Sequence, residues 1–396
     1  MSGRQVFRAI ALLWLAGNAL RLSLLALPPV LADVQADFAM SGTQVGILNG
    51  LPIALFALAA LPGSLLIARI GAVPALVAGL VLAAIGSALR GVVPGVLTLY
   101  AATAVMGAGI AFMQPALPAV VRQWLPDRVG FATAVFTNGL IVGEIIPVAL
   151  MTPLVLPLTG GNWREALALW ALPLIVIAIL IVIFAPRSAP RAAGVQIVRL
   201  RWWPDWNDGL VWRFGLILGS ANAAYFGSNA FVPAYLTSAG RPDLIAATLT
   251  ALNLGQLPAS FLILIFAGRL VRRTWPFVTL GLGAIAGVIG LATTASGWTV
   301  ASAALLGFSA GGALILSLTL PPLLKAPAEI APTSAAMFVM GYTEALTMSV
   351  IGGALWDLTG IVAFAFLPLV IGLTPLLFLP RTIQFGRRAQ PAPSAV

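Results

Sequence analysis

Twelve apolar segments, each long enough to cross a lipid bilayer, constrain the fold of this chain more than any other feature. A helix needs about 20 apolar residues to span a hydrocarbon core of about 30 Å. Backbone polar groups in lipid must be paired within the segment, so each span should be helical. The chain is therefore predicted to be an all-α polytopic membrane protein with twelve transmembrane helices. The predicted spans are 9–31, 45–67, 72–90, 96–121, 131–156, 166–185, 211–237, 244–268, 275–295, 298–324, 333–356 and 361–379.

Composition supports this fold class and excludes several kinds of site. The chain is 60% hydrophobic and 8% charged, whereas soluble domains carry about 25% charged residues. It contains no cysteine and no histidine, which rules out disulfides, thiolate or imidazole metal ligands and His-activated nucleophiles. No phosphate-binding G-x-x-x-x-G-K-[ST] motif is present either, so ATP drive is not indicated. We expect no metal, no cofactor and no enzymatic activity.

The basic residues are distributed unevenly between the two predicted sides of the membrane. With a cytoplasmic N-terminus, 17 of the 21 basic residues fall on the cytoplasmic side and three on the far side, while Arg21 lies inside the first span. This bias predicts that both termini are cytoplasmic. It also explains the net charge of +10 by topology and contact with anionic lipid, not by nucleic-acid binding. The far-side residues are Arg90, Arg164 and Arg241.

A polar stretch in the middle of the chain separates two groups of six predicted helices. We expect an N-terminal six-helix bundle at 1–185, a cytoplasmic linker at 186–209 and a C-terminal six-helix bundle with a short tail at 210–396. Within the linker, the sequence VRLRWWPDW (198–206) mixes arginine with three tryptophans. Such a segment is expected to lie in the lipid headgroups.

The two groups of helices repeat one another at an offset of about 203 residues. The matches cover four helix pairs, and the offset drifts only slowly along them, which favours two parallel, pseudo-symmetric repeats. Asn18, Arg21 and Pro29 match Asn222, Tyr225 and Pro233, and Leu48–Asn49 match Leu252–Asn253. Gly109, Leu117–Pro118 and Arg122 match Gly312, Leu320–Pro321 and Lys325, and Phe136 and Gly139 match Phe338 and Gly341.

This layout resembles the major facilitator superfamily and, within it, the cyanate/nitroimidazole permease family (CynX/NimT). The residues that carry the resemblance are GAGIAFMQPALPAVVR (107–122), NWREALALWALP (162–173) and Asn-x-x-Arg at 18–21. The resemblance implies a monomeric secondary transporter of the bacterial inner membrane, with a central solute site and alternating access. Two departures stand out. In the loop between the second and third spans, the superfamily usually has an acidic residue about three positions before a glycine, and here Ala68 stands before Gly71 instead. Glu144 and Glu344 lie in the fifth and eleventh spans, which are usually rich in Gly and Ala at these positions.

Arg21 is the main candidate for solute binding. A charge at membrane depth costs about 2.5–3.5 kcal/mol on insertion scales and therefore usually marks a functional site. Helical spacing places it on one stripe with Trp14, Gly17, Asn18 and Pro28, and a guanidinium suits small planar anions. Arg21 thus binds an anionic solute with Asn18 beside it, or it pairs permanently with Glu144 or Glu344.

Glu144 and Glu344 are the candidates for proton coupling. A buried carboxyl can bind and release a proton as its access to water alternates. The alternative is that these groups satisfy Arg21 and nearby hydroxyls. The two interpretations are compatible, because a pair that opens in one state is a switch.

Further polar residues are predicted to line a solute path, with helix packing as an equally open interpretation. Asn222, Tyr225 and Asn229 share one helix face, and Asn253, Gln256 and Ser260 share another. Gln114 precedes Pro115, where a local helix break is expected. Together these residues complete the predicted solute site.

The predicted function is proton-coupled secondary transport of a small anionic or polar solute, such as cyanate, a nitroimidazole or a short carboxylate. The alternative within transporters is a proton-coupled drug or cation exporter that uses Glu144 and Glu344. A membrane-embedded enzyme is disfavoured by the lack of His and Cys. A receptor that binds the solute without moving it stays open. The expected partners are the solute, protons and the lipid bilayer.

Overall fold

Every element in the described part of the chain is a helix. The computed structural model describes residues 3–186, 201–293 and 296–385, and the chain divides into two compact units, Met1–Trp203 (unit 1) and Pro204–Val396 (unit 2). Unit 1 contains α1 (Gly3–Leu22), η1 (Pro28–Val30), α2 (Leu31–Asp37), α3 (Gly42–Leu58), α4 (Ala60–Ile70), α5 (Ala72–Leu89), α6 (Val96–Trp124), η2 (Pro126–Arg128), α7 (Val129–Leu150), η3 (Met151–Val155), α8 (Leu156–Leu158), α9 (Trp163–Leu169) and α10 (Ala171–Phe184). Unit 2 contains α11 (Gly209–Ser238), η4 (Pro242–Leu244), α12 (Ile245–Leu254), α13 (Gln256–Leu270), α14 (Trp275–Thr293), α15 (Gly297–Leu324), α16 (Ile330–Thr359), η5 (Val362–Phe366), α17 (Leu367–Gly372), α18 (Thr374–Phe378) and η6 (Leu379–Thr382).

The described helices account for the twelve predicted spans. Nine helices or continuous helical runs are long and apolar enough to cross a membrane. The pair α3 and α4, bent by 48°, forms a tenth. The remaining two are α1 and α11, with 20 and 30 residues, in which polar side chains such as Arg21 and Asn222 interrupt the apolar sequence.

One predicted span is interrupted, and one expected interruption is absent. The first span, predicted over 9–31, is not a single helix, because α1 ends at Leu22 and the chain turns before η1 and α2. Pro28 and Pro29, which lack backbone N–H groups, begin η1 beyond this turn. The prediction that Pro28 lies on the stripe of α1 is therefore wrong. The break expected after Gln114 is also wrong, since α6 continues through Pro115 and Pro118.

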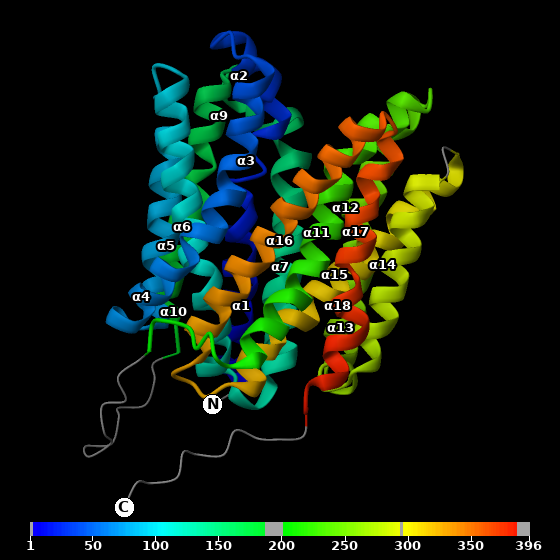
Figure 1. Cartoon of the computed structure of the whole chain (residues 1–396). Coiled ribbons are helices and arrows are strands. Elements are labelled where there is room, and N and C mark those ends of the chain that lie inside the picture. The colour runs from blue at the N-terminus through cyan, green and yellow to red at the C-terminus, as the bar shows by residue number, and fades with distance from the viewer. Residues whose placement is uncertain (1–2, 187–200, 294–295, 386–396) are drawn as a thin grey trace, which may run out of the picture. The chain divides into compact units, whose positions relative to one another are not determined.

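The same helix pairs form the core of each unit. In unit 1, α1 packs against α7 and α5 against α6 (Figure 1). In unit 2, α11 packs against α16 and α14 against α15. These are the first and fifth, and the third and fourth, spans of each half, so the internal repeat extends to the packing within each unit.

Only part of the predicted linker falls within the described residues. Residues 187–200 lie outside the described ranges, as do the first three residues of the segment 198–206. Next to them, the Ser64 hydroxyl at α4 donates a hydrogen bond to the Trp202 carbonyl oxygen over 2.8 Å. The Trp202 and Trp203 rings pack edge to face with centroids 5.1 Å apart. This contact ties the described end of the segment to unit 1.

Candidate functional site

Arg21 forms a buried ion pair with Glu144 inside unit 1. The Arg21 Nε donates a hydrogen bond to Glu144 Oε1 at 3.0 Å, and the two side chains are 8% and 11% exposed. The Arg21 guanidinium carbon also lies 5.6 Å from the centroid of the Phe56 ring on α3. Of the two carboxylates considered as partners, the structure therefore brings Glu144 to Arg21.

Close backbone contact between α1 and α7 positions this pair. A Cβ atom on Gly17 would lie 1.9 Å from the Phe136 carbonyl oxygen, and one on Gly143 would lie 2.5 Å from the Asn18 carbonyl oxygen. Only glycine fits at these crossings. Because Glu144 follows Gly143 directly, its side chain leaves α7 at the point where the two helices touch. Its carboxylate can therefore reach Arg21 on α1.

Asn18 is buried beside the pair and keeps one free acceptor. Its Nδ2 donates to the Trp14 carbonyl oxygen at 2.9 Å, while its Oδ1 has no hydrogen-bond partner among the described residues. The Trp14 indole donates to Asn138 Oδ1 on α7 at 2.9 Å. Asn138 was not predicted as a site residue. Its only sequence signal is its position six residues before Glu144.

Gln114 lies on α6 of unit 1, and the described residues do not meet the hydrogen-bonding capacity of its side-chain amide. It is 3% exposed, and neither its amide nitrogen nor its amide oxygen has a hydrogen-bond partner among the described residues. Burial of an unpaired amide costs about 1–3 kcal/mol. A residue of this kind is a candidate for contact with a polar ligand.

In unit 2, three predicted site residues form one hydrogen-bond network. The Tyr225 hydroxyl donates to Asn253 Oδ1, and Asn253 Nδ2 donates to Asn229 Oδ1 at 3.2 Å. Asn229 Nδ2 donates to the Tyr225 carbonyl oxygen at 2.9 Å. The network joins α11 to α12, which fits the packing interpretation.

Asn222 and Gln256 lie outside that triad of side chains. Asn222 on α11 is 7% exposed and approaches Gly341 of α16, where an added Cβ would lie 3.3 Å from its Nδ2. Gln256 begins α13 and is 3% exposed. Its amide reaches the Asn253 carbonyl oxygen only at 3.5 Å. An added Cβ on Gly311 would lie 2.9 Å from the Gln256 Cβ, so Gln256 packs on α15.

Glu344 differs from Glu144 because it has no cationic partner in the described part of unit 2. Its Oε2 is buried and accepts no hydrogen bond there. The carboxylate lies over two glycines. An added Cβ on Gly219 of α11 would lie 2.0 Å from Oε2, and one on Gly372 of α17 would lie 3.8 Å from Oε1. The two glutamates, which lie on the equivalent helices α7 and α16 of the repeat, therefore have unlike surroundings.

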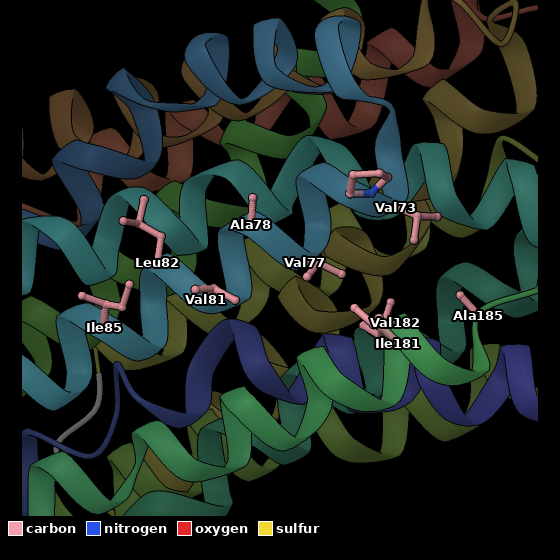
Figure 2. Close-up of a pocket in the computed structure, with 10 residues that line it drawn as sticks. Val73, Val77, Ala78, Val81, Leu82, Ile85, Ile181, Val182 and Ala185 are labelled. Atoms are coloured by element: carbon pink, nitrogen blue, oxygen red, sulfur yellow. The ribbon is translucent and has the colours of Figure 1, made fainter.

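A groove of about 630 Å³ on unit 1 has an entirely apolar lining and is unsuited to an anionic solute. Figure 2 shows the side chains of α5 and α10 that form it. Ile85 and Val182 in its walls are 48% and 68% exposed, as expected for a surface that contacts lipid. Within the described residues, no group of three His, Cys, Asp or Glu side chains could hold a metal.

Comparison with known proteins establishes the family. The sequence model of the Major Facilitator Superfamily matches residues 13–356. The chain belongs to the Major Facilitator Superfamily. It is therefore a multi-pass membrane protein, and the transporters it resembles support secondary transport of a small solute as its general function.

Three curated relatives match the chain over most of its length. The uncharacterized transporter YycB of Bacillus subtilis is 27% identical over 86% of this chain and 84% of its own. The 2-nitroimidazole transporter of Escherichia coli is 26% identical over 81% and 80%. The cyanate transport protein CynX of Escherichia coli is 26% identical over 78% and 80%. The resemblance to the cyanate/nitroimidazole permeases is thus confirmed.

A solved structure supports the superfamily fold. The proton:xylose symporter XylE bound to 6-bromo-6-deoxy-D-glucose aligns with a TM-score of 0.75 over 96% of both chains at 13% identity. At this identity the likeness concerns the fold alone. It supports the twelve-helix arrangement of the Major Facilitator Superfamily for this chain.

Proposed function

We propose that this chain is a proton-coupled secondary transporter of a small anionic or polar solute that works by alternating access. We place it in the bacterial inner membrane with both termini in the cytoplasm, as the distribution of basic residues favours. The observation that carries the proposal is the buried Arg21–Glu144 pair on α1 and α7. Cyanate and nitroimidazoles, named for two relatives, are small and planar and carry acceptor atoms that suit a guanidinium.

In the proposed cycle, the solute and Glu144 compete for Arg21. Glu144 holds the Arg21 Nε, and an arriving anion displaces the Glu144 carboxylate from the guanidinium. The coupled proton binds Glu344, whose Oε2 accepts no hydrogen bond from the described residues. Asn18 Oδ1 and the Gln114 amide, which lack hydrogen-bond partners among the described residues, add polar contacts to the solute. Departure of the solute restores the Arg21–Glu144 pair.

The unpartnered carboxylate of Glu344 favours one alternative function. A buried carboxylate without a cation nearby is a natural site for a cationic solute, so an exporter of drugs or cations is the second candidate. In that case Glu144 and Glu344 hold the cation, and Arg21 only modulates Glu144.

A thermal-stability screen of the purified protein separates the two candidates. Cyanate, short carboxylates, nitroimidazoles and organic cations are compared at two pH values. A ligand at about 100 times its dissociation constant adds roughly 2.7 kcal/mol to the stability of the folded state. We expect stabilisation by anions or neutral nitroimidazoles, lost in Arg21→Gln and weakened in Arg21→Lys, which keeps the charge without the planar fork. Stabilisation by cations that Glu344→Gln removes would establish the exporter instead.

A further inference from the structure

Arg90 is a fully buried cation that plays no part in the proposed transport cycle. It caps the C-terminus of α5 in unit 1 and is 0% exposed. Its Nη2 donates to the Ser23 carbonyl oxygen at 2.7 Å, to Ser23 Oγ at 2.8 Å and, more weakly, to Ser87 Oγ at 3.4 Å. Arg90 thereby binds the residue at which α1 breaks.

Most of the Arg90 guanidinium has no hydrogen-bond partner in the described part of the chain. Nε and Nη1 are buried and make no hydrogen bond to any described residue. These two atoms carry three of the five N–H donors of an arginine. An unmet buried donor costs about 1–3 kcal/mol, and more when the group is charged. The observed contacts of Nη2 therefore leave the larger part of the group unsatisfied.

The charge of Arg90 is also uncompensated by any described acidic residue. Arg21, Arg164, Arg241 and Lys325 each form an ion pair with an acidic side chain, whereas Arg90 has none among the described residues. The end of α1 and the end of α5 supply the partial negative charge of helix C-termini, about half a charge each before screening. A buried cation without an ionic partner is strongly unfavourable.

The neighbouring side chains supply no anion. Ser23 Oγ donates to Met106 Sδ at 3.1 Å on α6, and Ser87 Oγ donates to the Leu167 carbonyl oxygen at 3.2 Å on α9. Both hydroxyl protons are thus used elsewhere, and the two oxygens act only as neutral acceptors for Arg90. The group lies where α5, α6, α9 and the end of α1 come together.

We propose that a small monovalent inorganic anion of halide size binds at Nε and Nη1 of Arg90 as a resident counter-ion. Water can accept hydrogen bonds from these donors but does not neutralise the positive charge of Arg90. A halide ion does both. Complete burial favours a monatomic ion over an organic solute. The bound ion fixes Arg90 against Ser23 and so stabilises the break between α1 and α2.

The test is the thermal unfolding of the full-length protein as chloride replaces gluconate at constant ionic strength. The unfolding midpoint is expected to rise by a few degrees and to level off with chloride concentration, because the site saturates. Arg90→Gln is expected to abolish this rise. Arg164→Gln is the matched control, since it removes a partly exposed arginine of the same unit, and it should keep the chloride response. A native midpoint that does not change with chloride would overturn the proposal, as would an equal response in Arg90→Gln.

If Arg90→Gln does not fold, the native protein alone still decides the matter. Crystals grown in bromide are expected to show anomalous scattering beside Nε and Nη1 of Arg90. The absence of a bromide peak there would contradict the site. Neither measurement depends on solute transport, so failure of the proposed function leaves this inference intact, and the reverse also holds.

Discussion

At the scale of single residues, three buried ionisable groups have three different environments. Arg21 is balanced by Glu144, Glu344 has no cationic partner among the described residues of unit 2, and Arg90 is bound only by neutral oxygens. Burial of each group costs free energy unless its charge is compensated and its donors and acceptors are hydrogen-bonded. These differences in charge compensation and hydrogen bonding underlie the three proposed roles, which are a solute-binding pair, a proton site and an anion site.

The Arg21–Glu144 pair is predicted to be strongly coupled. Glu144→Gln leaves a buried arginine without its ionic partner and should lower the free energy of unfolding by about 3–5 kcal/mol. The double variant Arg21→Gln/Glu144→Gln removes both charges and should recover most of that loss. Thermal unfolding of the native protein, the single variants and the double variant completes the cycle. Additive losses in the double variant would show that the two groups act independently.

Glu344→Gln is predicted to uncouple transport from protons without harming the fold. The substitution removes a partly buried carboxylate that has no cationic partner among the described residues of unit 2, so stability should stay the same or rise. Solute-dependent proton uptake in proteoliposomes should disappear, while solute exchange continues. Asp357→Asn, at an exposed position on the same helix, is the control and should change neither reading. Normal proton uptake by Glu344→Gln would assign the coupling to another residue.

At the scale of helices, glycine contacts determine how closely the helices of a pair approach. An added Cβ on Gly17 meets the Phe136 carbonyl oxygen at 1.9 Å, and one on Gly307 meets the Leu252 carbonyl oxygen at 1.9 Å. Backbone atoms cannot move aside as a flexible side chain can. The contact between α1 and α7 therefore tolerates no side chain at Gly17.

Gly17→Ala is predicted to lower the free energy of unfolding by about 1–3 kcal/mol through overpacking. Gly50→Ala in α3 is the matched control, because an added Cβ there meets nothing within 4 Å. It should be neutral or stabilising by up to about 1 kcal/mol, since alanine favours helix more than glycine does. Chemical denaturation of the two variants compares these effects. Equal stability of both variants would contradict the close contact of α1 and α7.

The short helix α2 is held by an ion pair that should respond to acid. The Arg164 guanidinium donates to the Asp37 carboxylate and, helped by the Trp163 indole, keeps the pKa of Asp37 below its ordinary value of 3.8. A lowered folded-state pKa stabilises the protein above the unfolded pKa, and this stabilisation is lost as pH falls through the folded pKa. The unfolding midpoint of Arg164→Gln should therefore lie below that of the native protein at neutral pH. The two midpoints should converge below about pH 3.8, and a gap independent of pH would show that the pair contributes nothing.

The sequence predicts the helices well and their interruptions poorly. Apolar runs of spanning length reflect burial in lipid, so the twelve spans and the repeat could be predicted. The turn after Leu22 and the continuity of α6 through Pro115 depend on which neighbours satisfy the backbone, and composition does not contain that information. The pairing of Glu144 with Arg21 depends on the close contact at Gly143. The sequence places Arg90 on the far side of the membrane at the end of the span 72–90, and only the packing around Ser23 shows its burial.

At the scale of the whole molecule, the two units repeat one packing scheme with unlike chemistry. Each unit joins its first span to its fifth, α1 to α7 and α11 to α16. In unit 1, Arg21 and Glu144 pair at that contact. In unit 2, Glu344 lies against Gly219 there, and Tyr225 of α11 donates a hydrogen bond to Asn253 of α12. We infer that unit 1 recognises the solute charge and unit 2 handles the proton.

The measurement that tests this account most directly is solute uptake by proteoliposomes under an imposed pH gradient. Cyanate, 2-nitroimidazole, short carboxylates and organic cations are supplied to the native protein, Arg21→Gln and Glu344→Gln. We predict gradient-driven movement of an anionic or neutral polar solute by the native protein. Arg21→Gln should abolish it, and Glu344→Gln should make it independent of the gradient. Transport of cations alone, with Arg21→Gln still active, would contradict the central role of Arg21.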